Sequence, residues 1–374
     1  MTQLTALPPI ANFREVVVDL PAMTHNVSVM RERVAGSALL VVVKANGYGH
    51  GMIDCARAAL AGGADWLGVA DLTEALALRD AGITAPVLAW LHAPNETFTT
   101  AIVRDIALGV STREQLERIA EIGSGRVHLK LDTGLSRNGF APADWADVFA
   151  RAAELERVGA LVVEGIFSHV SNTHEDEDAA AATEFDRALE MARAAGLAPD
   201  FIHLSASLTA LTMPALNYSM VRIGLAAYGL SPIDGRDPSE FGLRPVMTVR
   251  SQVAAVRRVP AGVGVSYDYT YRPAAETTLA LVPVGYGEGV PRAGSNRAPI
   301  QVAGITSTVA GRVAMDQIVV DMADVAVAVG DEVVLFGDPA RGVPSAAQWA
   351  AACETNVYEI VTRMGGRLTR VVVE

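Results

Sequence analysis

The segment VVVKANGYGHG, residues 41–51, places Lys44 directly after a run of β-branched residues and before three glycines. A lysine at the end of a buried strand serves either as an ion-pair partner or as a nucleophile. Neighbouring cations lower the pKa of its amine, and a neutral amine forms a Schiff base with an aldehyde. Tyr48 adds a phenol, and the glycines let the backbone approach a ligand closely. Lys44 is therefore a candidate nucleophile.

A second group of residues has the chemistry of a phosphate site. The segment HLSAS, residues 203–207, offers two hydroxyls before an expected helix start, and RIG, residues 222–224, offers backbone N–H groups. Hydroxyls and N–H donors at a helix N-terminus bind phosphate. An amine for an aldehyde, together with a phosphate site, matches pyridoxal 5'-phosphate (PLP).

The elements that must position these groups form repeated strand–helix units. Between residues 39 and 225, short β-branched runs alternate eight times with segments whose apolar residues have helical spacing. Such a repeat predicts a (β/α)8 TIM barrel, in which the carboxyl ends of the strands form the active-site rim. The eight runs end at polar residues: Lys44, Asp71, His92, Thr112, Lys130, His169, Ser205 and Arg222.

The pattern of the sequence changes at about Pro245. From there, strand-like runs are separated by Gly, Asp and Pro turns, with one helical segment among them. We therefore expect an α/β protein with an N-terminal (β/α)8 TIM barrel over residues 13–240 that binds PLP, and a C-terminal mainly β domain over residues 241–374. The strand-like FREVVVDL, residues 13–20, could pair with the β domain, and an N-terminal strand within residues 1–12 could join it.

Composition argues against several classes of protein. The 374 residues are 51% hydrophobic and 19% charged, and no apolar run approaches the roughly 20 residues that a membrane span requires. The net charge of -12, without a basic cluster, makes a nucleic-acid partner unexpected. The chain start lacks the pattern of a secretion signal, and Cys55 and Cys353 are too few for a disulfide framework or a thiolate metal site. We expect a soluble cytoplasmic protein that binds no metal and no membrane.

Beyond these patterns, the sequence resembles the alanine racemases over nearly its whole length. The similar segments occur in the family's order: VVVKANGYGHG, HLKLDTGLSRNG, GIFSHV, MVRIGLAAYG, VSYDYTY, VPVGYGEGVPR, GRVAMDQ and VYEI. The resemblance implies that Lys44 carries PLP as a Schiff base. It also implies that the protein interconverts L-alanine and D-alanine, and that it supplies D-alanine for the peptidoglycan of a bacterial cell wall.

The resemblance further implies a two-base mechanism. Removing the Cα proton from one face and returning a proton to the other requires a base on each side of the cofactor. Lys44 resembles one base and Tyr267 the other, with His169 and Arg222 supporting the phenolate electrostatically. The resemblance also implies that Arg222 faces the ring nitrogen of PLP, and because a guanidinium has only donors, that nitrogen would stay unprotonated. Barrel PLP decarboxylases have a carboxylate in this place, so Arg222 favours a racemase.

Other family positions imply ligand contacts. Arg137 and the backbone N–H of Met315 resemble the groups that bind the substrate carboxylate, and Lys130 resembles a lysine that carries a carbamate in many members. An unmodified Lys130 would repel Arg137, so an anion is expected nearby. The residues that resemble ligands of the PLP phosphate are Tyr48, Ser207, Ile223, Gly224 and Tyr358. Three more resemble residues that surround the cofactor or line the access corridor: His203, Tyr286 and Arg292.

The resemblance also implies an active site shared between subunits. The family residues that match Tyr267 and Met315 enter the site from the other subunit of a head-to-tail homodimer. Three positions depart from the family pattern: Glu288 stands where Asp is usual, Ala314 where Cys is usual, and Asp268 where Gly is usual. The carboxylate of Asp268 would disfavour a phenolate at Tyr267, so the rate or the substrate preference could differ.

Three alternatives stay open. The first is a racemase of the same architecture that acts on serine, lysine or a broad range of amino acids, although a narrow pocket between Tyr267 and Tyr358 favours alanine. The second is a noncatalytic PLP-binding protein, which would not need Tyr267. The third is a Schiff-base aldolase that uses Lys44 without a cofactor.

Overall fold

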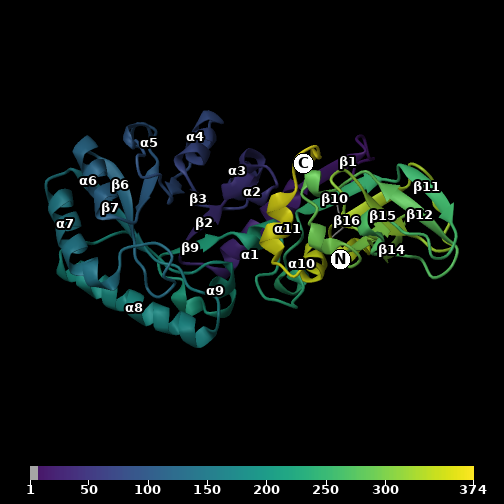
Figure 1. The fold of residues 1–374 in the computed structure, drawn as a ribbon. Coiled ribbons are helices and arrows are strands. Elements are labelled where there is room, and N and C mark those ends of the chain that lie inside the picture. The colour runs from purple at the N-terminus through teal and green to yellow at the C-terminus, as the bar shows by residue number, and fades with distance from the viewer. Residues whose placement is uncertain (1–6) are drawn as a thin grey trace.

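The computed structural model describes residues 7–374 as an α/β barrel beside a mainly β region (Figure 1). The barrel helices surround the barrel strands in one half of the molecule. Two β-sheets lie in the other half, together with helices α10 (Ala346–Ala352) and α11 (Val357–Arg363). The fold class expected from the sequence, a (β/α)8 TIM barrel followed by a mainly β domain, is confirmed.

The barrel is one eight-stranded sheet with the order β8-β7-β6-β5-β4-β3-β2-β9, parallel throughout. Its strands are β2 (Ala38–Val42), β3 (Trp66–Val69), β4 (Val87–Ala89), β5 (Ala107–Val110), β6 (Gly125–Lys130), β7 (Leu161–Phe167), β8 (Phe201–His203) and β9 (Met220–Ile223). In β2 and β9, Leu39 lies opposite Val221. The seam beside β8 is bridged by a backbone hydrogen bond from Arg222 N to Ser205 O at 3.1 Å. Strands buried on both faces read as near-continuous apolar runs, as in β3 and β5, whose residues are all buried.

Helices flank these strands on the outside of the barrel. They are α1 (Leu20–Arg33), α3 (Met52–Ala61), α4 (Leu72–Asp80), α5 (Thr99–Val103), α6 (Arg113–Ile122), α7 (Trp145–Arg157), α8 (Glu175–Ala194) and α9 (Ser207–Thr212). Two of the polar residues expected at the rim begin helices. Asp71 Oδ1 accepts a hydrogen bond from Glu74 N at 3.0 Å, and Thr112 Oγ1 accepts one from Gln115 N at 3.3 Å. Helix capping therefore explains Asp71 and Thr112 without any ligand.

The mainly β region contains a six-stranded and a three-stranded sheet, with the orders β14-β13-β16-β10-β1-β17 and β11-β12-β15. Their strands are β1 (Arg14–Asp19), β10 (Met247–Gln252), β11 (Ala255–Val259), β12 (Thr277–Val282), β13 (Pro299–Val302), β14 (Ile305–Thr308), β15 (Ile318–Asp321), β16 (Glu332–Phe336) and β17 (Thr369–Val373). Within the described residues, no helix has the length and apolar composition needed to cross a membrane.

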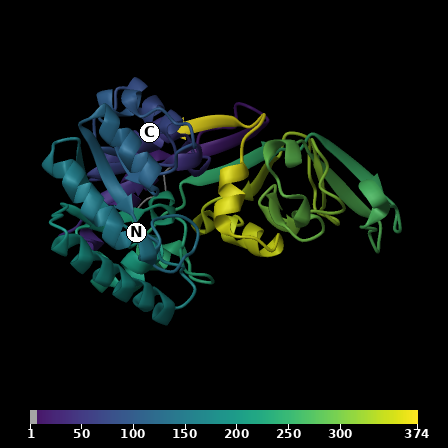
Figure 2. The ribbon, with the colours of Figure 1, turned by 60° about the vertical axis from the view of Figure 1, so that its left-hand side comes forward.

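Strand β1 links the two halves of the molecule. It pairs antiparallel with β10 and parallel with β17, so FREVVVDL lies in the six-stranded sheet, and Figure 2 shows β17 beside β1. Of the N-terminal strand expected within residues 1–12, residues 7–12 form no strand and residues 1–6 lie outside the described part of the chain. Strand β1 precedes the barrel in the chain but belongs to the six-stranded sheet of the mainly β region. The domain boundaries therefore stay a prediction.

A buried ion pair ties β1 to β10. Arg250 Nη2 lies 2.7 Å from Glu15 Oε2, and the exposed fractions of the two side chains are 2% and 0%. The N–H groups of Ala11 and Asn12 also donate to Glu15 Oε1, at 3.0 and 2.8 Å. Burial alone would raise the pKa of Glu15, but the hydrogen bonds from Asn12, Arg250 and Ala11 outweigh burial and lower it. Glu15 is therefore a charged group inside the protein.

Replacing Arg250 with Met should lower the free energy of unfolding by about 3–5 kcal/mol, because it leaves the buried carboxylate without its cation. Arg236→Met, which breaks a half-exposed pair with Glu240, is the control and should cost less than about 1 kcal/mol. Urea denaturation at neutral pH measures both. Because folding lowers the pKa of Glu15, its stabilising contribution is present above the ordinary glutamate pKa and is lost as the pH falls through the lowered value. Equal losses in the two variants would contradict this account.

Candidate active site

Lys44 follows β2 and begins α2 (Lys44–Tyr48), a short left-handed turn. Residues 45–47 have φ angles of 52°, 54° and 62°, in the left-handed region that costs a non-glycine residue about 1–2 kcal/mol. Glu74 Oε1 helps to hold the turn by accepting the Ala45 N–H at 2.6 Å. Strain of this kind, maintained by surrounding contacts, is typical of functional sites.

Cations crowd the mouth of the barrel. The two lysines of the chain, Lys44 and Lys130, both lie there, at the ends of β2 and β6. Burial lowers the pKa of Lys44, and the charges of Arg137 and Arg222 lower it further, against an opposing effect of Glu74. Burial, followed by the charges of Arg137, Arg222 and Lys44, lowers the pKa of Lys130 to about 8. The sequence-based expectation of an amine with a lowered pKa among cations agrees with this arrangement.

Arg222, in β9, is buried, and both of its Nη atoms have hydrogen-bond partners. Nη1 donates to His203 O at 3.0 Å and lies 2.9 Å from His203 Nδ1. Nη2 donates to Ser168 O at 2.8 Å and to Leu204 O at 3.0 Å, and lies 3.3 Å from His169 Nδ1. Burial lowers the pKa of Arg222 to about 10, so the guanidinium stays charged near neutral pH. Arg222 is thus a cation with a fixed orientation.

His169, shortly after β7, is a neutral imidazole. Burial, and then the charge of Arg222 and of three further cations at the mouth, lower the pKa of His169 to about 3. Because Arg222 has donors only, His169 Nδ1 must accept, which leaves the ring proton on Nε2. His169 therefore offers one N–H donor and no positive charge.

The residues expected to bind phosphate lie together beside Arg222. Ser207 Oγ accepts hydrogen bonds from the N–H groups of Gly224 at 3.1 Å and Ala226 at 3.3 Å. A Cβ on Gly224 would lie 2.5 Å from Tyr48 Oη, so glycine is what lets the Tyr48 hydroxyl approach the backbone here. The ring of Tyr48 lies 5.9 Å from that of Tyr358, which α11 contributes. The structure thus brings together five of the predicted residues: Tyr48, Ser207, Ile223, Gly224 and Tyr358.

Tyr267 and Met315 are not brought to Lys44 within one chain. Their exposed fractions are 69% and 54%, and within the described residues neither makes a hydrogen bond, ion pair or ring contact with Lys44. Asp268, next to Tyr267, has its Oδ2 atom 3.2 Å from Nε of Arg312. A cation therefore already faces the carboxylate that was expected to disfavour a phenolate.

Arg137 and Glu288 occupy opposite environments. Arg137 is exposed, and no hydrogen bond or ion pair engages it within the described chain. Glu288 is fully buried, where its Oε2 accepts the Gly285 N–H at 2.8 Å and its Oε1 lies 3.0 Å from Arg14 Nη1. Glu288 therefore stabilises the turn that carries the exposed Tyr286. Two further residues named from the sequence are Arg292, which is exposed, and Ala314, which is buried.

Sequence reasoning missed two aromatic residues of the site. The ring of Phe167 stacks on that of His203, with centroids 4.7 Å apart and planes 2° from parallel, and Arg222 Cζ lies 5.6 Å from its centroid. Lys44 Nζ lies 5.7 Å from the ring of Trp90. Phe167 and Trp90 stand in apolar strand runs, where an aromatic side chain gives no signal distinct from core packing.

The barrel, the lysine at a strand end and the surrounding cations define an α/β-barrel enzyme with its active site at the carboxyl ends of the strands. A family model of the alanine racemase N-terminal domain matches residues 18–232, and one of the alanine racemase C-terminal domain matches residues 246–372. The chain belongs to the alanine racemase family and is an isomerase.

Known members are similar over nearly the whole chain. The alanine racemase of Thermobifida fusca is 48% identical over 96% of this chain and 98% of its own length, and that of Salinispora arenicola is 47% identical over 94% and 95%. Among solved structures, alanine racemase from the D-cycloserine producer Streptomyces lavendulae has a TM-score of 0.95 at 43% identity, covering 98% of both chains. Alanine racemase from Streptomyces coelicolor A3(2) has a TM-score of 0.94 at 43% identity, covering 96% of this chain and 98% of its own.

Proposed function

We propose that the protein interconverts L-alanine and D-alanine with PLP as its cofactor, and that it supplies D-alanine for peptidoglycan. The observation that carries this proposal is the position of Lys44. Lys44 follows β2, and the neighbouring strand β9 carries the Arg222 guanidinium. Burial and the charges of Arg137 and Arg222 lower the pKa of the Lys44 amine. The name shared by the relatives supports alanine as the substrate.

The residues at the mouth fit PLP. Lys44 would bind its aldehyde carbon as a Schiff base. The hydroxyls of Tyr48 and Ser207, which lie beside the Gly224 backbone, would hold the phosphate. Arg222 would face the ring nitrogen. When bound, PLP withdraws electrons from the substrate Cα and so acidifies its proton.

The remaining tasks fall to side chains of this protein. Lys44 takes or returns the Cα proton on one face of the substrate, and Tyr267 does so on the other. The neutral His169, with its proton on Nε2, donates toward the tyrosinate and stabilises it. Arg137, which is exposed and unpaired in the described chain, binds the substrate carboxylate together with the Met315 N–H.

Lys130 is proposed to supply a further anion among these cations, in addition to Glu74 and Asp132. Its pKa, lowered to about 8 by burial and by the surrounding cations, leaves a sizeable neutral fraction near that pH. The neutral amine is the form that adds carbon dioxide to become a carbamate. A carbamate on Lys130 would face Arg137 and fix its guanidinium for the substrate.

The active site is proposed to be completed in a head-to-tail homodimer. Tyr267 and Met315 are exposed and make no hydrogen bond, ion pair or ring contact with Lys44 within one described chain, so a second subunit would have to bring them to the site. Activity per milligram should therefore fall toward zero when the protein is diluted below its dimer dissociation constant. Initial rates over a dilution series, compared with sedimentation at the same concentrations, measure this. Full activity of a sedimenting monomer would contradict the shared site.

Chiral chromatography of the products tests the proposed reaction. With PLP present, L-alanine should give D-alanine until the two enantiomers are equal, and D-alanine should give L-alanine. Serine and lysine are assayed in parallel, and faster racemisation of either would refute alanine as the preferred substrate. If every enantiomer stays unchanged, the protein is a PLP-binding protein rather than a racemase. Carbon–carbon cleavage without PLP would instead identify an aldolase.

A further inference from the structure

A line of buried polar side chains runs from Arg222 into the barrel wall, and the proposed chemistry does not use it. Arg222 Nη1 lies 2.9 Å from His203 Nδ1, and His203 Nε2 lies 2.9 Å from His128 Nδ1. His128 Nε2 then faces Glu164 Oε2 at 3.5 Å, a longer electrostatic contact. The four residues come from β9, β8, β6 and β7. We name this set, Arg222, His203, His128 and Glu164, the relay.

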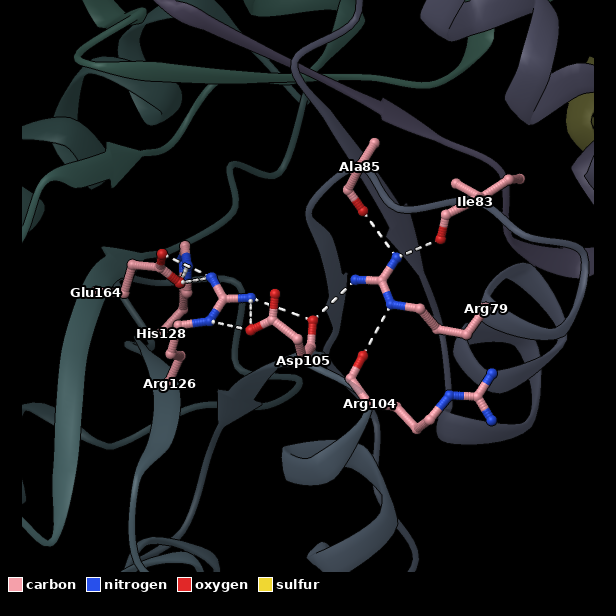
Figure 3. Close-up of polar contacts among 8 residues, drawn as sticks. All are labelled: Arg79, Ile83, Ala85, Arg104, Asp105, Arg126, His128 and Glu164. Atoms are coloured by element: carbon pink, nitrogen blue, oxygen red, sulfur yellow. Dashed lines mark hydrogen bonds and ion pairs between the residues drawn. The ribbon is translucent and has the colours of Figure 1, made fainter.

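The far end of the relay is anchored among charges (Figure 3). Arg126 Nη1 donates to Oε1 and Oε2 of Glu164 at 2.7 and 2.8 Å, and Arg126 Nη2 lies 2.9 Å from Asp105 Oδ1. Glu164 therefore stays a carboxylate: burial would raise its pKa, but His128 and Arg126 outweigh burial and lower it. The relay thus joins a cation at the mouth to an anion at its other end.

The N–H groups in the relay must all point from Arg222 toward Glu164. Arg222 cannot accept, so His203 Nδ1 accepts and the ring proton of His203 lies on Nε2. That proton is donated to His128 Nδ1, so the proton of His128 lies on Nε2, facing Glu164. Both imidazoles are neutral, since burial lowers the pKa of each. The reverse order would set a His203 N–H against an Arg222 N–H.

The surrounding residues are shaped around the two rings. Gly165 lies opposite His128 in the β6–β7 register, and a Cβ there would lie 2.2 Å from His128 Nδ1. The ring of Phe167 stacks on His203, and the ring of Phe201 lies 9° from parallel to that of His128. Both imidazoles have an exposed fraction of 0%. Burying two polar rings costs free energy that an aliphatic pair would avoid, which favours a role beyond packing.

We propose that His203, His128 and Glu164 are positioning residues that fix the orientation of the Arg222 guanidinium, with the Glu164 charge selecting the proton positions of both rings. Without that charge, the proton of His128 is free to move to Nδ1, from which it would be donated to His203 Nε2. The proton of His203 would then lie on Nδ1, where it would face an N–H group of Arg222. The inference rests on the proposed function only for what Arg222 does in the reaction. The proton positions can be measured in a protein of any activity.

Glu164→Gln tests the relay, because a glutamine offers one acceptor oxygen where Arg126 and His128 both need one. The matched control is Glu117→Gln on α6, which also pairs with an arginine, at 2.8 Å from Arg151 Nε and 2.8 Å from Nη2, but outside the barrel. Glu164→Asp keeps the charge and serves as the rescue variant. The first readout is nitrogen-15 NMR of the seven histidines, assigned by single His→Gln substitutions in the full-length protein.

In the wild type, His128 and His203 should each show a protonated Nε2 and an unprotonated Nδ1. In Glu164→Gln both signals should move toward averaged proton positions, and kcat should fall about tenfold with KM unchanged. The Asp variant should restore the NMR pattern, and Glu117→Gln should match the wild type. The proposal is overturned if either ring of the wild type has its proton on Nδ1. It is also overturned if Glu164→Gln matches Glu117→Gln in both readouts. A wild type without racemase activity would refute the proposed function and leave the NMR result decisive for the relay.

Discussion

Replacing Tyr267 with Phe should lower kcat/KM for alanine racemisation about a thousandfold, because it removes one of two proton-transferring groups. The loss should affect the two faces of the substrate differently. In deuterium oxide, one enantiomer should still exchange its Cα hydrogen through Lys44, while the other should stop. Proton NMR of the Cα signal for each enantiomer measures this directly.

Tyr269→Phe is the control for this experiment. Tyr269 stands two residues away, is 61% exposed, and has no part in the proposed chemistry, so its loss should change kcat/KM less than about twofold. If Tyr267→Phe leaves both enantiomers exchanging at wild-type rates, the two-base mechanism fails. If it stops both, Tyr267 supports the site as a whole and does not serve one face.

Replacing Lys44 with Ala should remove the covalent attachment of PLP and lower kcat by a factor of about 10⁴ or more. Borohydride reduction of the wild type, followed by peptide mapping, should place the phosphopyridoxyl group on Lys44. The Lys44→Ala protein should carry no phosphopyridoxyl group at residue 44 and should lose the visible absorbance of the Schiff base between lysine and PLP.

Lys130→Ala is the matching control, because it removes the other lysine of the chain. This variant should still carry the reduced label on Lys44, whatever its rate. A label on Lys130 in the wild type would overturn the site assignment. Persistent activity in Lys44→Ala would show that Lys44 is neither the attachment point nor a base.

Most of the fold could be predicted because the barrel strands are buried on both faces. Runs such as LLVVV and WLGV are apolar and short, and the segments between them show helical spacing. The left-handed turn at residues 45–47 was not predictable from propensity, since Ala45 disfavours positive φ, although Asn46 and Gly47 tolerate it. Contacts from distant residues, including Glu74, maintain it.

The site could be predicted only in part, for reasons that differ from residue to residue. Lys44 comes just after β2 and Arg222 lies near the end of β9, so strand position put both among the eight rim candidates. Their chemistry and the family resemblance then singled them out. His128 and Glu164 stand inside strands, where a polar residue signals nothing until its partner on a neighbouring strand is known. Gly165 gave a possible signal, because a glycine in a strand often makes space for another group. The role proposed for Tyr267 requires a second subunit, which one sequence does not show.

The lysine count has a practical consequence. Apart from the α-amino group, the chain has no primary amine outside the mouth of the barrel, and its remaining basic side chains are arginines and histidines. Apart from labelling the α-amino group, an amine-reactive dye would therefore react only at the mouth of the barrel, and there only where neither PLP nor a carbamate covers the lysine. Protection from that dye would measure how fully the pocket is filled, and coupling the protein to a support through its amines would risk blocking the pocket.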